Sequence, residues 1–146
     1  MAAALPRHTL LVTHPPPRHG PPVTSKHVPF YLALEVASQA WAATLAEYCG
    51  DLVSPVDMAV VNVTGNFFRE VFVGEVDVEV ALKRIGTSSV TFLLELFQAG
   101  HRAGTVDLVV AQVDAGRVHA VPLSPAQRAA LQAIPASPGQ EPARWT

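Results

Sequence analysis

The residues around one predicted helix start could carry out acid–base chemistry. His27 stands two residues before Pro29, and proline suits the first turn of a helix because its missing N–H costs nothing there. The next backbone N–H groups, on Phe30 and Tyr31, would lie at the positive end of the helix dipole, where they can stabilise a developing negative charge. The same dipole disfavours a charged imidazole, so a neutral His27 could accept a proton. The pattern predicts a base beside an oxyanion site.

Two further side chains are candidate bases. His19 lies in the preceding proline-rich loop, and Glu35 lies on the polar stripe of the helix. Each candidate also has an ordinary structural interpretation. His19 could simply be solvated, His27 could cap the helix, and Glu35 could be a surface or dimer-interface charge beside Gln39. The sequence leaves the identity of the base open among the three.

Candidate phosphate-binding residues lie where one predicted strand ends and the next begins. Lys83 and Arg84 are adjacent cations, and paired positive side chains suit phosphate oxygens. Ser88 and Ser89 could join them as ligands, although serines at a strand start are more often turn residues. The four residues therefore form one candidate binding group.

A second group of side chains suits a pocket. Asn62 and Thr64 alternate with Asn66 on one face of a predicted strand, where they either line a pocket or face water. Trp41 in the helix and Phe67 in that strand are large apolar side chains, and their packing would set the depth of such a pocket. We expect Asn62, Thr64, Trp41 and Phe67 to line it.

Composition narrows the classes of function. The 146 residues are 49% apolar and 15% charged, which suits one folded domain. A net charge of -2 without a basic stripe argues against nucleic-acid binding. No apolar run approaches the ~18 residues of a membrane span. The start, Met1 to Ala4, lacks the basic region of a signal peptide, so we expect a cytoplasmic protein.

Several well-known catalytic motifs do not occur. His14, His19 and His27 lack the spacing of a metal site, so neither a metal nor another cofactor is expected. There is no Gly-x-Ser-x-Gly elbow and no phosphate loop. Cys49 is the single cysteine and would lie at a helix C-terminus, where the dipole makes it a poor nucleophile.

One long helix must position these residues. It is predicted from about Pro29 to Tyr48, with Gly50 as its left-handed stop. Apolar side chains cover most of its circumference, and only Glu35, Ser38 and Gln39 form a polar stripe. A helix that is apolar nearly all round is typical of a buried one.

Five strand-like segments accompany this helix. They alternate in polarity or form apolar runs bounded by turn residues. Gly65 is expected to mark a bulge or bend. A short last helix, capped by Ser124, is expected from Pro125 to about Ala133. The predicted strands are His8–Thr13, Met58–Glu70, Glu75–Arg84, Ser88–Phe97 and Thr105–Val113, with turns at 73–74 and 99–104.

This order of elements predicts an α+β fold. A single apolar helix has to be covered by the one sheet, and a curved antiparallel sheet wrapped around a long helix is the hot-dog architecture. We expect a single domain over residues 1–133 and a loosely ordered tail over 134–146.

The stretch Arg18–Trp41 resembles the first loop and helix of the hydroxybenzoyl-CoA thioesterase family. It looks closest to the branch that includes the Tol-Pal-associated acyl-CoA thioesterase. The stretches Thr64–Glu75 and Val80–Phe92 are also similar to the family, and the resemblance covers about residues 8–133. Aligned without gaps, the family's histidine falls on His27, its aromatic pair on Phe30 and Tyr31, and its Glu-x-Ala motif on Glu35 and Ala37.

Two positions depart from the family pattern. The position of the catalytic aspartate is Gly20, and that of the arginine after Glu-x-Ala is Ser38. No acidic residue occurs from Met1 to Leu34, so the usual carboxylate is missing from its loop. The enediyne-pathway thioesterases, which are similar in lacking that acid, use polar side chains and a helix N-terminus instead.

The resemblance implies a thioesterase that hydrolyses an acyl-CoA or acyl-carrier-protein thioester, with CoA as part of the substrate. It also implies a homodimer or a dimer of dimers, with the pantetheine arm threading between subunits. Two alternatives stay open. A non-catalytic acyl-thioester-binding protein is favoured by the missing aspartate. A hydroxyacyl-thioester dehydratase or hydratase would place His27 and a carboxylate across the tunnel from each other.

Overall fold

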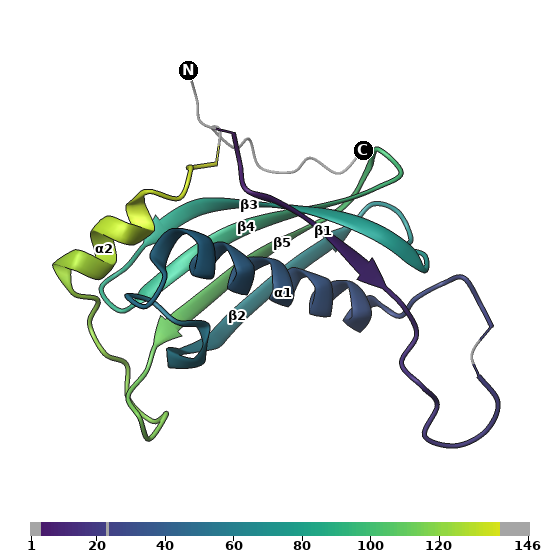
Figure 1. Ribbon diagram of the computed structural model, residues 1–146, viewed down its shortest axis with the longest axis horizontal. Helices are drawn as coiled ribbons and strands as arrows, with labels where there is room; N and C mark the ends of the chain where they lie inside the picture. Colours follow the sequence, from purple (N-terminus) through teal and green to yellow (C-terminus); the bar gives the residue numbers. More distant parts are fainter. Residues whose placement is uncertain (1–3, 23, 138–146) are drawn as a thin grey trace.

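The computed structural model describes residues 4–22 and 24–137. A long helix, α1 (Phe30–Cys49), lies against one face of a curved five-stranded antiparallel sheet (Figure 1). A 3-10 turn, η1 (Pro55–Asp57), precedes the sheet's second strand, and a short helix, α2 (Pro125–Gln132), follows its last. The strands are β1 (Arg7–Val12), β2 (Met58–Phe67), β3 (Gly74–Ile85), β4 (Ser89–Gln98) and β5 (His101–Gln112), in the spatial order β1-β3-β4-β5-β2. The predicted α+β hot-dog architecture is confirmed.

The hydrophobic core lies between α1 and the sheet. Trp41 stacks on Phe92 of β4, with ring centroids 6.5 Å apart. The alternation in the sequence predicts which strand residues point inward, and most of these are fully buried. They include Val76, Val78 and Val80 of β3 and Val90, Phe92, Leu94 and Leu96 of β4.

Helix α1 is buried on one face only. Ala33, Ala37 and Ala40 face the core, whereas the predicted polar stripe of Glu35, Ser38 and Gln39 is exposed. At its first turn, Phe30 and Tyr31 are 68% and 52% exposed. The polar stripe is thus exposed as expected, whereas the apolar first turn is less buried than the pattern indicates, because one sheet covers only one side of the helix.

The irregularities of the strands fall at unexpected positions. The register of β2 with β5 shifts between Val60 and Asn62, so Val61 is the bulged residue, whereas Gly65 pairs regularly with Val106. Strand β2 also ends at Phe67 instead of Glu70. Strand β5 begins at His101, earlier than expected, because the preceding turn needs only two residues with positive φ. Those residues are Ala99 (φ 51) and Gly100 (φ 78).

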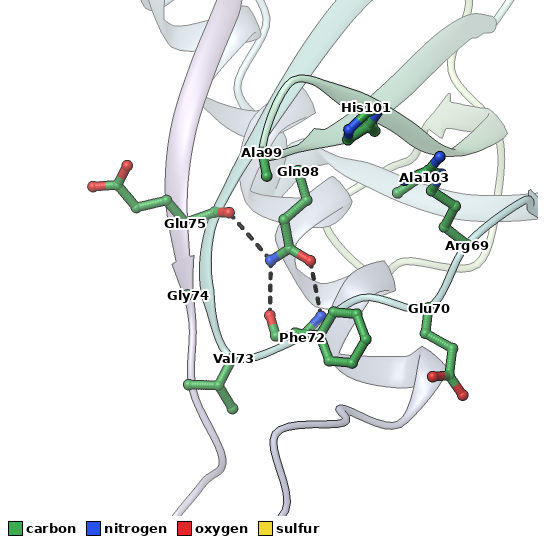
Figure 2. Close-up of a pocket in the computed structure, with 10 residues that line it drawn as sticks. All are labelled: Arg69, Glu70, Phe72, Val73, Gly74, Glu75, Gln98, Ala99, His101 and Ala103. Carbon is green, nitrogen blue, oxygen red and sulfur yellow. Dashed lines mark hydrogen bonds between the residues drawn. The ribbon is translucent and has the colours of Figure 1, made fainter.

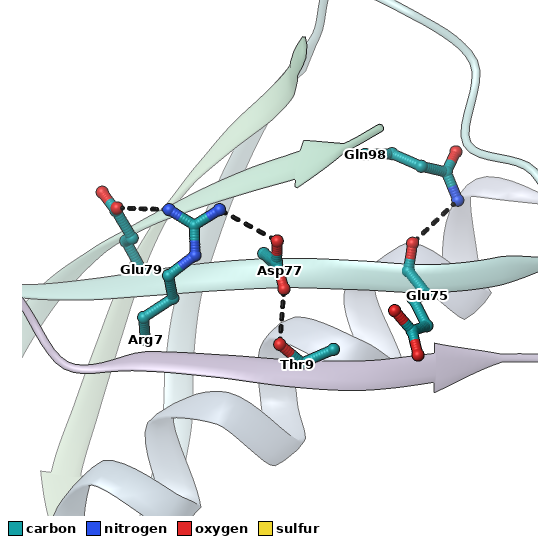
Figure 3. Close-up of polar contacts among 6 residues, drawn as sticks. All are labelled: Arg7, Thr9, Glu75, Asp77, Glu79 and Gln98. Atoms are coloured by element: carbon teal, nitrogen blue, oxygen red, sulfur yellow. Dashed lines mark hydrogen bonds and ion pairs between the residues drawn. The ribbon is translucent and has the colours of Figure 1, made fainter. Parts of the chain in front are cut away.

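Side chains hold the edge strand β1 against β3 (Figure 3). The Arg7 guanidinium donates to Asp77 at 2.9 Å and to Glu79 at 3.0 Å, and the Thr9 hydroxyl donates to Asp77 at 2.6 Å. The hydrogen bonds from Thr9 and then Arg7 hold the pKa of the Asp77 carboxyl below its usual value.

The packed chain continues beyond α2. Ile134 is 1% exposed, and Leu82 exchanges backbone hydrogen bonds with Pro135 and Ser137. Residues 134–137 therefore pack against the end of β3. Residues 138–146 of the expected tail, and residues 1–3 of the chain start, lie outside the described residues. Among the helices described, none is long and apolar enough to cross a membrane.

Candidate active site

The start of α1 is fixed by a short backbone ladder. Residues 26–28 pair with part of the segment that joins β2 to β3, residues 68–73, which we call the β2–β3 link. The Val28 N–H donates to the Val71 carbonyl at 3.1 Å, and the Val73 N–H donates to the Lys26 carbonyl at 2.8 Å. This ladder holds the residues that precede the helix against the link.

Gln98 holds the other side of the β2–β3 link (Figure 2). Its side-chain oxygen accepts from the Phe72 N–H at 2.9 Å, and its amide nitrogen donates to the carbonyls of Phe72 at 2.8 Å and Glu75 at 3.3 Å. The link is therefore tied both to the helix start and to the end of β4.

This arrangement brings His27 next to a carboxylate. The Nδ1 atom of His27 lies 2.8 Å from an oxygen of Glu70, which belongs to the β2–β3 link. The imidazole also packs against the Phe72 ring, with centroids 5.2 Å apart. A negatively charged carboxylate oxygen this close to Nδ1 favours a proton there over a lone pair, and the lone pair of a neutral imidazole is then on Nε2. No hydrogen bond to Nε2 occurs among the described residues.

The first turn of α1 leaves backbone donors free. Pro29 is the N-cap and has no N–H, and no side chain caps the helix. The Leu32 N–H turns back to the Pro29 carbonyl at 3.0 Å. Within the described chain, the N–H groups of Phe30 and Tyr31 have no acceptor. They are therefore free to donate to a ligand.

Two clefts are lined by residues of the helix start. One, of about 390 Å3, lies between α1 and the end of β2 and is lined by Phe30, Ala33, Phe67 and Glu70, among others. The second, of about 490 Å3, is lined by His27 and Tyr31 together with the proline-rich loop. Glu70 thus lines the first cleft together with Phe30, and His27 lines the second together with Tyr31.

The other two candidate bases lie elsewhere. His19 is exposed in the proline-rich loop, and Glu35 is exposed on the outer side of α1. Neither side chain has a hydrogen bond or ion pair within the described chain. Gly20, at the position of the family aspartate, adopts a φ of 83° and is also exposed. Of the three candidates, only the His27 side chain has a polar partner within the described chain.

The expected pocket residues divide between two faces of the sheet. Trp41 is 6% exposed and lines a cavity of about 200 Å3 with Val60 and Val63, and its indole N–H has no partner in the described chain. Asn62 and Thr64 are exposed and bonded to each other at 3.2 Å. Because neighbouring strand residues alternate, and Val63 faces α1, Asn62 and Thr64 point to the opposite face.

The candidate phosphate-binding residues lie at the far end of the sheet within one chain. Arg84 is ten residues along β3 from Gly74, about 33 Å at the usual strand rise. Lys83 already contacts Asp107 at 2.6 Å, whereas Arg84 is exposed and has no side-chain partner in the described segments. Ser88 and Ser89 offer their backbone carbonyls to Gln112 and Gly86 at the turn between β3 and β4.

Other catalytic chemistries find little support in the described residues. No group of three or more metal-ligating side chains occurs among them. Cys49 is buried, and this burial raises the pKa of its thiol, which makes it a poor nucleophile.

Comparison with known proteins decides the family. The model of the thioesterase superfamily matches residues 33–105, which is half of the chain. The chain belongs to the thioesterase superfamily. No curated protein gives a significant match.

Solved structures of low sequence identity share the thioesterase-superfamily fold. A thioesterase from Thermus thermophilus, complexed with coenzyme A and zinc, is 21% identical, with a TM-score of 0.72 over 88% of this chain and 92% of its own. A 1,4-dihydroxy-2-naphthoyl-CoA thioesterase from Synechocystis is 14% identical, with a TM-score of 0.68 over 90% and 98%. A protein from Staphylococcus aureus in complex with CoA is 12% identical, with a TM-score of 0.77 over 97% and 92%.

Glu70 is the residue that sequence reasoning missed. The proline-rich loop of this superfamily member has no acid, but the β2–β3 link places one against His27. One feature of the sequence could have pointed to it: Glu70 is an acid at the end of a predicted strand, after Phe67 and Phe68 and just before the Val73–Gly74 turn. Nothing in the sequence, however, indicated that this turn lies beside the helix start.

Proposed function

We propose that this protein hydrolyses an acyl-CoA or acyl-carrier-protein thioester by direct attack of water. The observation that carries the proposal is the uncapped start of α1, whose Phe30 and Tyr31 N–H groups are free, three and four residues after an imidazole that contacts a carboxylate at 2.8 Å. Membership of the thioesterase superfamily supports the same chemistry. The sequence resemblance supports a place in the hydroxybenzoyl-CoA thioesterase-like family, on its Tol-Pal-associated branch.

The proposed mechanism uses His27 first as a base and then as an acid. Nε2 of His27 takes a proton from water as the water oxygen forms a bond to the thioester carbonyl carbon. The N–H groups of Phe30 and Tyr31 stabilise the resulting oxyanion. When the carbon–sulfur bond breaks, the imidazolium returns its proton to the departing thiolate. The products are a carboxylic acid and a free thiol, and no cofactor takes part.

Non-catalytic binding is the second candidate function, and Gly20 is the observation that favours it. A pure binder, however, would need only apolar or neutral groups beside the thioester, whereas His27 and Glu70 lie there. A dehydratase is less well supported, because Glu70 contacts His27 directly instead of facing it across a tunnel.

We also propose that two copies of the chain pair along β2, with a dimer of dimers as the larger alternative. β2 is an edge strand, and it exposes Val60, Val61 and Val63 by 48%, 58% and 45%. Such an apolar edge is a template for pairing with another strand. Antiparallel pairing would bring Arg84 of one copy toward the His27 end of the other. That geometry supports a role for Arg84, with Lys83, Ser88 and Ser89, in binding CoA phosphates between subunits.

Release of free thiol from purified protein tests the proposal. The substrates would be short, long and aromatic acyl-CoAs and an acyl-carrier-protein thioester, and we expect saturable release from at least one class. Changing His27 to Ala should lower kcat about 10²–10⁴-fold, whereas His19→Ala and Glu35→Gln should leave it nearly unchanged. Tight binding without thiol release would instead establish the non-catalytic function.

A further inference from the structure

We infer that Glu70 is a positioning residue that sets the tautomer of His27 for catalysis. This inference rests on the proposed function, because it gives the carboxylate a use only if His27 acts as a base. The contact is direct, at 2.8 Å between His27 Nδ1 and a Glu70 oxygen. Glu70 would thus act through His27 and would not itself touch the substrate.

The tautomer matters because an isolated neutral imidazole mostly carries its proton on Nε2. That form presents no lone pair at Nε2 and could not take a proton from water there. Because a Glu70 carboxylate oxygen lies 2.8 Å from Nδ1, a proton on Nδ1 is favoured over a lone pair facing the negative charge, and Nε2 is then free. The carboxylate also stabilises the imidazolium that forms when water is deprotonated. The same role belongs to the third group in catalytic sites that combine a nucleophile, a base and a group that orients the base.

The surrounding structure holds the pair in this geometry. The backbone ladder from Val28 to Val71 and from Val73 to Lys26 fixes the two segments on either side of the pair. The Phe72 ring restricts rotation of the imidazole, with centroids 5.2 Å apart. Because His27 and Glu70 are 60% and 68% exposed, their attraction adds little to stability, and orientation is the effect that remains.

The inference also accounts for the missing acid of the proline-rich loop. Gly20 leaves that loop without a carboxylate, and the described part of the loop holds His14, Arg18 and His19 but no acid. Glu70 supplies a carboxylate to a residue before the same helix start from a different segment, the β2–β3 link. Here the carboxylate does not contact water itself but controls the group that does.

The test combines kinetics with nitrogen-15 NMR of the imidazole. We expect Glu70→Ala to lower kcat about 10–100-fold with a nearly unchanged KM, the range seen when an orienting group is lost. Glu70→Gln should be intermediate, because its amide oxygen keeps only a partial negative charge near Nδ1. His27→Ala combined with Glu70→Ala should be no slower than His27→Ala alone. Glu75→Ala is the matched control, since Glu75 is an exposed neighbour whose carboxylate has no partner in the described chain.

The NMR signal separates the two proposals. His27 should show the Nδ1–H tautomer in the unmodified protein and shift toward Nε2–H in Glu70→Ala. A protein that releases thiol but loses nothing in Glu70→Ala overturns the role of Glu70 and leaves the proposed function standing. An Nε2–H tautomer in the unmodified protein overturns it as well. Absence of turnover with every thioester, by contrast, rejects the proposed function and the catalytic use of the pair with it.

Discussion

The side chain of Gln98 bonds both the N–H and the carbonyl of Phe72, at 2.9 and 2.8 Å, much as a neighbouring strand would. This amide replaces a ladder partner that the β2–β3 link otherwise lacks on that side. Since Glu70 lies two residues before Phe72, the position of the carboxylate depends on this pair of hydrogen bonds (Figure 2).

Replacing Gln98 with Ala should loosen the link. Three hydrogen bonds are lost and two carbonyls and one N–H lose their partner, so we expect the free energy of unfolding to fall by about 1–3 kcal/mol. Urea denaturation would measure the change. Gln132→Ala is the control, because Gln132 is exposed and has no side-chain bond within the described chain. Equal stabilities of the two variants would contradict the importance of the Gln98 contacts.

Replacing Phe30 with Pro removes a single backbone donor at the proposed oxyanion site. Proline suits the first helical position, and Pro29 already has a ψ of 150°, which is compatible with a following proline. We expect kcat to fall about 10²–10³-fold while the protein stays folded. Phe30→Ala is the matched control, since it removes the ring and keeps the N–H. Similar kcat values for both variants would exclude the Phe30 N–H as an oxyanion donor.

Asp77 should make the stability of the fold sensitive to acid. Its pKa is lowered in the folded state by Thr9 and Arg7, so the unfolded chain binds the proton more readily. The stabilisation is fully present above the ordinary aspartate pKa of about 3.9 and is lost as the pH falls through the lower folded-state value. Unfolding measured from pH 7 downward should therefore show Asp77→Asn less stable than the unmodified protein at neutral pH, with the difference shrinking in acid. Asp51→Asn, at an exposed position without a side-chain partner in the described segments, should show no such trend.

Ser124 should stabilise α2 through its capping box. Its hydroxyl accepts from the Gln127 N–H at 3.1 Å, and the Gln127 side chain accepts from the Ser124 N–H at 2.9 Å. Ser124→Ala should lower the free energy of unfolding by about 1 kcal/mol. Ser54 also precedes a short helical turn but makes no capping bond, so Ser54→Ala serves as the comparison in the same denaturation experiment. A loss of equal size in Ser54→Ala would show that the capping bonds are not its cause.

Burial in the sheet could be predicted wherever it depends on local alternation. The buried side chains of β3 and β4, from Val76 to Leu96, occur at every second residue. The alternation predicts them because one face of each strand meets the helix. The bulge could not be found in this way. It lies at Val61, where the pairing of β2 with β5 changes register, and a bulge of this kind needs no glycine.

The sequence predicted one part of the candidate site, the helix start, but not the carboxylate that contacts His27. Pro29 and the local pattern alone predict where the helix starts, that His27 precedes it, and that the N–H groups of Phe30 and Tyr31 are free. They do not predict the partner of His27, because the contact with Glu70 depends on how the β2–β3 link crosses the helix start. Likewise, the exposure of Phe30 and Tyr31 could not be predicted, because it depends on the sheet covering only one side of α1.

The link between β2 and β3 also carries a consequence for the order of folding. It gathers residues that are remote in the chain, with Phe72 and Gln98 separated by 26 positions and His27 further away on the other side. Contacts of such long sequence separation form late, after local turns and hairpins, because the loops between them must first be closed. The β4–β5 hairpin can form early around Ala99 and Gly100, whereas the imidazole and its carboxylate meet only when the sheet has closed on the helix. The His27–Glu70 pair is thus expected to form late in folding, so catalytic activity should appear only when folding is complete.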